Sequence, residues 1–185
     1  MSTYWISREV NTVKKKFRMT DPFKLSESLG IIVRYEPMGI GEGACKGFFF
    51  VHSRIKTVTI NSDLTEENQR IICAHELGHA ILHSKSAGVK AFHDFQLFDS
   101  TSAKEYEANI FAADLLMTDD DVLDALNDNI SFFGAAARLN VPPELLDFKF
   151  RVMKRNGYKL IDPPILANGN FLKGLKQNGD ERYEN

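Results

Sequence analysis

Apolar side chains recur at a helical period near the start of the chain, over residues 7–17 and again over 21–30. Asp21 is followed by Pro22, and proline fits the first turn of a helix because the N–H that it lacks would have no partner there. Both segments are therefore predicted as helices.

The period changes from helical to extended after residue 30. Segments 31–36 ("IIVRYE"), 46–53 ("KGFFFVHS") and 56–62 ("KTVTINS") are short, rich in β-branched or aromatic side chains and bounded by turn formers. They predict three strands, which we expect to form a small meander.

The helical period then returns. Asp63 and Glu66 have the spacing of a capping box, which predicts a long helix over about 64–84. After a loop, a further helix is predicted at about 102–117, and residues 119–157 indicate two or three more helices.

These elements predict an α+β protein with a small three-stranded sheet packed on helices. We expect a core over residues 1–118, a helical subdomain over 119–160 that packs on this core, and a loose tail over 161–185.

Composition and charge narrow the class of protein. With 43% hydrophobic and 26% charged residues the chain should fold, and its net charge of −2 offers no global attraction to nucleic acid or to an anionic membrane. No apolar run approaches the roughly 20 residues that span a bilayer, and the amino terminus lacks a signal-peptide pattern. Cys45 and Cys73 are too few for a disulfide scaffold, so we expect a cytoplasmic protein in which Cys73 is buried and inert.

The pentapeptide "HELGH" lies inside the helix predicted over 64–84. Residues four apart on a helix lie about 40° from each other, so His75 and His79 can bind one ion. Glu76 lies about 100° around from His75, where a carboxylate can take a proton from water on the metal.

The surroundings of this motif favour metal binding over chance. Apolar side chains occupy nearly every direction of the helix, which predicts that it is buried. The histidines and the glutamate then need partners, since an unpaired buried polar group costs about 1 to 3 kcal/mol. One zinc ion would satisfy them together. The alternative, core histidines bonded to backbone carbonyls, explains one histidine better than two.

A catalytic zinc ion usually takes three protein ligands. On the next predicted helix, Glu105 shares a stripe with Ala108 and Ala112, and these small side chains would let this helix approach the first one closely. Glu107 shares its side with Asp114, which indicates a wetter face. Glu105 is therefore the predicted third ligand, and Glu107 is the alternative.

Further polar residues flank this predicted site. Asn109, one turn after Glu105, could hydrogen-bond the second nitrogen of a ligand histidine. His83 continues the spacing of four, and it either contacts substrate at the rim of the site or is a partly exposed histidine at the helix end. His93 and Asp94 either help to bind substrate or are solvated loop residues.

The chain also resembles the ImmA/IrrE family of bacterial and phage-associated metallopeptidases, over roughly residues 20–118. The resemblance is carried, in chain order, by "DPFKLSESLGIIVRYEP", "KGFFFVHS", "TVTIN", "RIICAHELGHAILH" and "EYEANIFAADLLM". It implies a zincin core of the gluzincin type with one zinc ion, bound by His75, His79 and a glutamate of the last segment, and Glu76 as the catalytic acid and base.

The same resemblance implies a substrate. Members of the family are associated with regulated cleavage of helix-turn-helix repressors, which switches on mobile-element or stress genes. Thr118 stands where the family often has a proline, a difference that affects a turn and leaves the chemistry untouched.

In the expected reaction, zinc polarises the scissile carbonyl and lowers the pKa of its water towards ~7, while Glu76 carries the proton to the leaving amine. A further donor would stabilise the oxyanion, and Tyr106, His83 and His93 are open candidates. The substrate peptide could add as a strand beside residues 46–53.

Two other functions remain open at the level of sequence. Residues 131–155 predict a helix, a short turn and a helix whose basic stretch "KFRVMKR" could contact DNA phosphates, although the acidic helix before it argues against direct nucleic-acid binding. A zinc-bound regulator without efficient proteolysis would have no need of Glu76. No pattern predicts a membrane partner, and the oligomeric state is left open.

Overall fold

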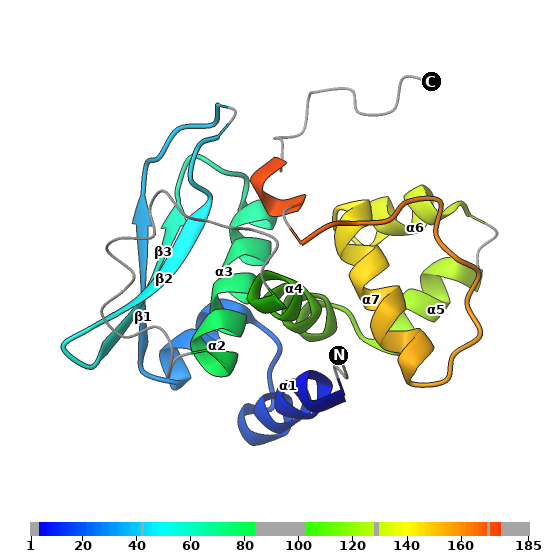
Figure 1. Cartoon of the computed structure of the whole chain (residues 1–185), viewed down its shortest axis with the longest axis horizontal. Helices are drawn as coiled ribbons and strands as arrows, with labels where there is room; N and C mark the ends of the chain where they lie inside the picture. The colour runs from blue at the N-terminus through cyan, green and yellow to red at the C-terminus, as the bar shows by residue number, and fades with distance from the viewer. Residues whose placement is uncertain (1–3, 42, 84–102, 128–129, 170, 175–185) are drawn as a thin grey trace.

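A computed structural model describes residues 4–41, 43–83, 103–127, 130–169 and 171–174 (Figure 1). The helices are α1 (Tyr4–Phe17), α2 (Pro22–Ser28), α3 (Glu66–Leu82), α4 (Ala103–Leu116), α5 (Asp119–Asn127), α6 (Phe132–Arg138), α7 (Pro143–Arg155) and the short 3-10 helix η3 (Phe171–Gly174). The strands are β1 (Ile31–Glu36), β2 (Gly47–His52) and β3 (Ile55–Asn61). The predicted α+β class with a three-stranded sheet is confirmed. None of the described helices has the length and apolar character that a membrane crossing requires.

The amino-terminal caps of α2 and α3 differ in how well the sequence predicted them. Asp21, where the helix was predicted to start, caps α2, because its Oδ1 accepts hydrogen bonds from the backbone N–H groups of Phe23 and Lys24, both at 2.9 Å. The capping box predicted at Asp63 is wrong. Thr65 caps α3, and the Asp63 carboxylate instead accepts from the backbone N–H of Gly39 at 2.7 Å, in the loop after β1.

The strand order is β1-β3-β2, so the predicted meander is wrong. β2 and β3 form an antiparallel hairpin, and β1 pairs with β3 in parallel. Ser53 and Arg54, the two residues between β2 and β3, both have positive φ values, 49° and 67°, which suits a type I′ hairpin turn. The central strand β3 is the most buried of the three, and this order leaves β2 at an open edge.

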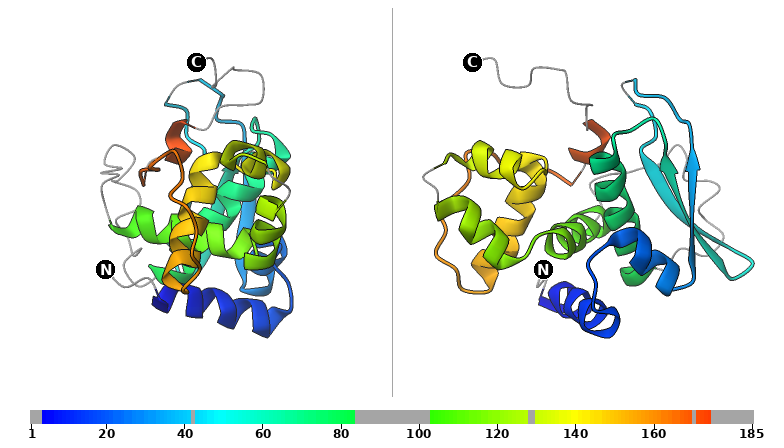
Figure 2. Two further views of the ribbon diagram at one scale, coloured as in Figure 1. Left: turned by 90° about the vertical axis from the view of Figure 1, so that its right-hand side faces the viewer. Right: turned by 180° about the vertical axis from the view of Figure 1, so that it is seen from behind.

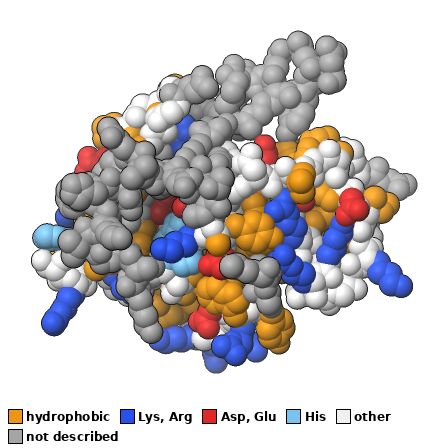
Figure 3. Space-filling view, viewed as in Figure 1, with side chains coloured by type: hydrophobic (Ala, Val, Ile, Leu, Met, Phe, Trp, Pro, Cys, Tyr) orange, Lys and Arg blue, Asp and Glu red, His pale blue; other side chains and the backbone are white. Residues whose placement is uncertain are grey.

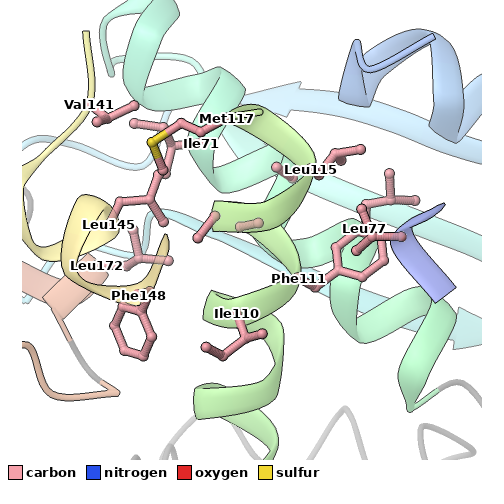
Figure 4. Packing of buried hydrophobic residues seen from close by; sticks show 14 of the residues in the cluster. Ile71, Leu77, Ile110, Phe111, Leu115, Met117, Val141, Leu145, Phe148 and Leu172 are labelled. Atoms are coloured by element: carbon pink, nitrogen blue, oxygen red, sulfur yellow. The ribbon is translucent and has the colours of Figure 1, made fainter. Parts of the chain in front are cut away.

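The sheet and the carboxy-terminal helices lie on opposite sides of the α3–α4 pair (Figures 1 and 2). α3 packs on β2, β3 and α4, and α4 packs in turn on α7. Ile71 and Leu77 of α3, Ile110 and Phe111 of α4, and Phe148 of α7 belong to one continuous apolar core (Figure 4). The predicted "HELGH" helix is thus enclosed by packing on two sides.

A buried charge cluster holds the carboxy-terminal helices to α4. Lys149 of α7 is only 1% exposed, and its Nζ lies 2.8 Å from Oδ1 of Asp114 and 2.7 Å from Oδ1 of Asp119. Lys14 of α1 donates to the backbone carbonyl of Asp114 at 2.5 Å. Because a buried charge is tolerated only with partners, the cluster fixes how these helices meet.

Residues 161–185 were predicted as a loose tail, and three of the described residues in this segment are packed against the core instead. Ala167, Phe171 and Leu172 are buried, and the rings of Phe171 and Phe148 have centroids 5.6 Å apart. These apolar residues follow no helical or strand period, so their burial could not be inferred from the pattern.

Candidate metal centre

His75 and His79 lie on one face of α3, as their spacing predicts. Their Nε2 atoms are 3.1 Å apart, and their ring centroids 4.7 Å. Two imidazole nitrogens at this distance cannot both carry a proton towards the other, so at least one lone pair points into the space between them. Their side chains are 6% and 16% exposed, which leaves this space mostly enclosed.

Helix α4 adds a carboxylate to the pair. Oε2 of Glu105 lies 3.2 Å from Nε2 of His75, and its Oε1 lies 3.3 Å from Nε2 of His79. The ligand atoms of these three residues all lie within 4.8 Å of one another, and the described part of the chain holds no second such group of His, Cys, Asp or Glu. Glu107, the alternative third ligand, lies apart from the group, with its Oε2 3.5 Å from Nε2 of His83.

The charge state of Glu105 fits this position. Burial by itself would raise the pKa of the carboxyl group, but hydrogen bonds and charge interactions with His75 and His79 outweigh it and hold the pKa well below its usual range. Glu105 is therefore ionised at neutral pH, as a metal ligand has to be.

Close packing of α3 on α4 brings this carboxylate into reach. A Cβ atom added to Gly78 would lie 3.2 Å from the Cα of Ala108 and 3.2 Å from the Cβ of Phe111. The glycine of "HELGH" and an alanine of α4 thus meet at the crossing of the helices. The expectation that small side chains on α4 allow a close approach is confirmed at Ala108.

We expect the substitution G78A to separate the two helices. Overpacking against the α4 backbone costs about 1 to 3 kcal/mol, which outweighs the gain of roughly 1 kcal/mol from replacing glycine inside a helix. Thermal unfolding should show a lower melting temperature and a chelator titration a weaker metal affinity, because Glu105 moves with α4.

Gly134 of α6 offers a matched control. A Cβ atom there would meet side-chain atoms of Ile130 at 3.3 Å and of Ser131 at 3.4 Å, and no backbone atom. G134A should keep both the stability and the metal affinity. Equal behaviour of G78A and G134A would contradict the close-packing explanation.

Glu76 is buried beside the group, with 7% of its surface exposed. Burial raises the pKa of its carboxyl group to about 7; the nearby charge of Glu105 raises it further, while His79 and a hydrogen bond from the backbone of Phe49 act in the opposite direction. A carboxylate with such a pKa can both accept and return a proton near neutral pH.

The hydrogen bond from Phe49 places Glu76 next to the open edge of the sheet. The N–H of Asn61 donates to the carbonyl of Lys46 at 3.0 Å, which makes these two residues a hydrogen-bonded pair. In an antiparallel ladder every second residue forms such a pair, so the backbone groups of Phe48 and Phe50 also point to β3. Those of Phe49 and Val51 therefore face outwards, on the side where β2 packs against α3. The outward-facing backbone groups of β2 thus lie next to the Glu76 carboxylate, which already accepts from the N–H of Phe49.

The buried carboxyl group of Glu76 should lower the stability of the metal-free chain above neutral pH. Its pKa is raised on folding, so the folded chain binds more protons than the unfolded chain between about pH 4.5 and 7, and stability falls as the pH rises through this range. We expect E76Q to raise the free energy of unfolding by on the order of 2 kcal/mol at pH 8 and to change it little at pH 4. Urea denaturation in the presence of a chelator measures both; equal stabilities at pH 8 would contradict the burial cost.

His83 lies next to the group without joining it. Its ring centroid is 5.5 Å from that of His79, its side chain is 11% exposed, and burial lowers its pKa to about 4. His79 and Glu105 are 16% and 18% exposed, and Figure 3 shows histidine side chains reaching the surface near acidic and basic ones. Among the described residues the group is thus only slightly exposed, with His83 beside it.

The other predicted residues make their contacts outside the three-residue group. The hydroxyl of Tyr106 accepts a hydrogen bond from Nη2 of Arg155 at 3.2 Å, so Tyr106 points to α7 and is a poor candidate for the oxyanion donor. Nδ2 of Asn109 donates to the carbonyl of Gly169 at 2.8 Å. Burial raises the pKa of Cys73 to about 12, in line with the expected inert thiol. His93 and Asp94 lie outside the described residues.

The sequence analysis missed the contribution of β2. Gly47 is required where this strand meets α3, because an added Cβ would lie 2.4 Å from Cγ2 of Ile72 and 2.9 Å from the carbonyl oxygen of Thr59. A glycine at the start of an aromatic-rich strand is the one signal of this close approach. The hydrogen bond from Phe49 to Glu76 could not be predicted from the sequence, because almost every residue has a backbone N–H.

The three side chains fit a divalent metal ion. Two imidazole nitrogens and one carboxylate are a donor set of catalytic zinc sites, in which a water takes the fourth position. Nδ1 of His75 is buried and has no hydrogen-bond partner in the metal-free chain, whereas the second nitrogen of a metal-binding histidine usually donates to an acceptor. A helix with the H-E-x-x-H motif, joined by a glutamate from a second helix, defines the class of this protein as a metallopeptidase.

Comparison with known proteins identifies the family. The model of the IrrE N-terminal-like domain, a family of M78 peptidases, matches residues 26–151. The chain belongs to the ImmA/IrrE family, as its motifs indicated, and membership of a metallopeptidase family implies a metal cofactor.

Two relatives agree with this assignment. The chain is 33% identical over 144 residues to "Uncharacterized immunity region protein 2" of Bacillus phage phi105, covering 78% of this chain and 88% of the relative. It is 32% identical over 114 residues to "Metallopeptidase ImmA" of Bacillus subtilis (strain 168), covering 60% of this chain and 65% of that protein.

Proposed function

We propose that the protein is a zinc-dependent endopeptidase with a gluzincin-like minimal core over residues 1–118 and one zinc ion per chain. The observation that carries the proposal is the convergence of His75, His79 and Glu105 from two helices, with buried Glu76 alongside. Imidazole and carboxylate donors suit zinc, and an intact acid at position 76 would serve no purpose at a purely structural site. A bound regulator without proteolysis is therefore the weaker reading.

The chain's own residues account for the proton movements. His75, His79 and Glu105 would hold the zinc ion, which when bound lowers the pKa of its water towards ~7 and polarises the scissile carbonyl. The Glu76 carboxylate accepts a proton from the attacking water and returns it to the leaving amine. The N–H of Phe49 keeps this carboxylate in place while it changes its protonation state.

The open edge of β2 would align the substrate. An extended peptide can pair with the outward-facing carbonyl of Phe49 and with the backbone groups of Val51, and this pairing would set its scissile bond beside Glu76. Backbone pairing needs no particular side chains, so selectivity would have to come from the shape of the substrate or from neighbouring surfaces.

We propose a helix-turn-helix repressor as the substrate, cleaved in the cytoplasm to switch on mobile-element or stress genes. The family resemblance supports this substrate, as does the name of the phage relative, which places that protein in an immunity region. The described helices α5, α6 and α7 could help to grip such a partner.

Direct DNA binding is a weaker proposal because the basic stretch of α7 is already engaged. Lys149 is paired with Asp114 and Asp119, Arg151 with Asp147, and Lys154 with Asp162. Cations that are paired within the protein contribute little to the release of counterions from DNA.

The proposal is tested with the full chain and helix-turn-helix repressors from its own genome. Elemental analysis of the purified protein should find one equivalent of zinc, and incubation with one of these repressors should yield two fragments whose junction mass spectrometry locates. A chelator should stop cleavage, and added zinc should restore it. If the repressors stayed intact in the presence of zinc-loaded protein, the proposed substrate would be wrong. If the chain bound no metal, the proposed peptidase activity would be wrong.

A further inference from the structure

Asn109 links the candidate metal centre to the chain that follows α7. It lies on α4 one turn after Glu105 and is fully buried. Its Nδ2 donates to the carbonyl of Gly169 at 2.8 Å, whereas its Oδ1 is buried without a hydrogen-bond partner. A buried amide oxygen that accepts no hydrogen bond costs about 1 to 3 kcal/mol, so a role in another state of the protein is the natural reason for keeping it.

A complementary atom lies on α3. Nδ1 of His75 is also buried without a partner, while Nε2 of the same ring faces Glu105 and His79. When Nε2 binds a metal, the neutral imidazole carries its hydrogen on Nδ1, which then needs an acceptor. Asn109 Oδ1 is the acceptor left over on the helix that packs against α3.

Residues 161–169, here called the strap, hold the other side of the Asn109 amide. The N–H of Ala167 donates to Oδ2 of Asp147 at 2.9 Å, and Nη2 of Arg151 donates to the carbonyl of Ala167 at 2.6 Å. Ala167 is buried, and Asp147 and Arg151 are joined by an ion pair on α7. The strap is thus fixed to α7 two residues before Gly169.

The strap determines which way the amide faces. A carbonyl oxygen accepts hydrogen bonds and cannot donate them, so Gly169 selects the rotamer of Asn109 that presents Nδ2 to the strap and leaves Oδ1 on the opposite side. If the strap were released, the amide could turn and bring Nδ2 towards His75, where two donors would face each other.

We propose that Asn109 is a positioning residue of the metal centre and that the strap sets its orientation, so that metal binding and docking of the strap support each other. This inference rests on the proposed zinc site. Binding of zinc at Nε2 of His75 creates the Nδ1 donor, Oδ1 of Asn109 accepts from it, and Nδ2 remains on Gly169. Such coupling is reciprocal: the ion stabilises the docked strap by as much as the docked strap stabilises the bound ion.

The zinc affinity of the full chain tests the first part of the proposal, that Asn109 positions His75. N109A should bind zinc about 10- to 100-fold more weakly than the wild type in competition with a chromophoric chelator, because outer partners of ligand histidines contribute about this much. N109D keeps an acceptor for His75 and should bind within about threefold of the wild type or more tightly. N61A is the matched control: Asn61, at the end of β3, is an equally buried asparagine whose side chain makes four hydrogen bonds, and its loss should lower stability but not zinc affinity.

Amide hydrogen exchange of residues 161–169 tests the second part of the proposal, that metal binding and docking of the strap are coupled. Zinc should slow amide exchange in the wild-type strap, since it raises the free energy of local opening. In N109D zinc still binds, but the carboxylate cannot donate to Gly169, so zinc should leave exchange in the strap unchanged.

Each outcome bears on a different part of the proposal. Zinc affinity of N109A within about twofold of the wild type would overturn the positioning role. Equal protection of the strap by zinc in N109D and the wild type would overturn the coupling, and this comparison stands even if N109A does not fold. A wild-type chain that binds no zinc would overturn the proposed function itself, and the inference with it.

Discussion

E76Q is expected to lower kcat/KM for cleavage of the repressor by about 10²- to 10⁴-fold, the usual contribution of a general base. The amide of glutamine fills the same volume and can still accept the hydrogen bond from Phe49, but it cannot take a proton from water at neutral pH. Because Glu76 donates nothing to the three-residue group, zinc affinity should stay close to that of the wild type.

The measurement combines a cleavage time course with a zinc titration on the same preparation. Reduced cleavage with normal zinc content assigns the proton transfer to Glu76. Cleavage at the wild-type rate would show that another group is the base, and loss of zinc together with activity would show that Glu76 supports the site rather than the reaction.

E105Q is expected to weaken zinc binding by more than about 100-fold, since even the outer partners of metal ligands contribute about 10- to 100-fold. The carboxylate lies within 3.3 Å of both histidine nitrogens, and its substitution removes the one negative charge of the donor set. Cleavage should be lost in parallel with the metal.

Glu107 provides the control for this substitution. It lies on the same helix two residues away and contacts His83 instead of the group, so E107Q should keep zinc affinity within about threefold of the wild type. If E107Q lost the metal and E105Q kept it, the third ligand would be Glu107 and the two helices would have to rotate on metal binding.

Much of the candidate site could be predicted because its geometry is local. The spacing of His75 and His79 places them on one face of any helix, and this needs no knowledge of the fold. The stripe of Glu105 with Ala108 follows from the same period, and the structure places that glutamate, and not Glu107, beside the histidines.

The hydrophobic pattern could not predict the parts of the site that depend on contacts between residues distant in sequence. The hydrogen bond from Phe49 to Glu76 and that from Asn109 to Gly169 join segments that no period relates. Lys149 was part of a stretch considered for DNA phosphates, yet it is buried between Asp114 and Asp119. A charged side chain looks the same in sequence whether it faces solvent or an acidic pair.

By itself, then, the sequence determined the helices, the strands and the pairing of two histidines with a glutamate, because hydrophobic period and side-chain spacing act over one or two turns of chain. The tertiary structure alone decided that β1 pairs with β3, that β2 keeps a free edge next to Glu76, and that Ala167, Phe171 and Leu172 are buried. The reason is physical: strand order and the course of an irregular segment depend on which distant surfaces bury each other best, and many arrangements satisfy the same local pattern.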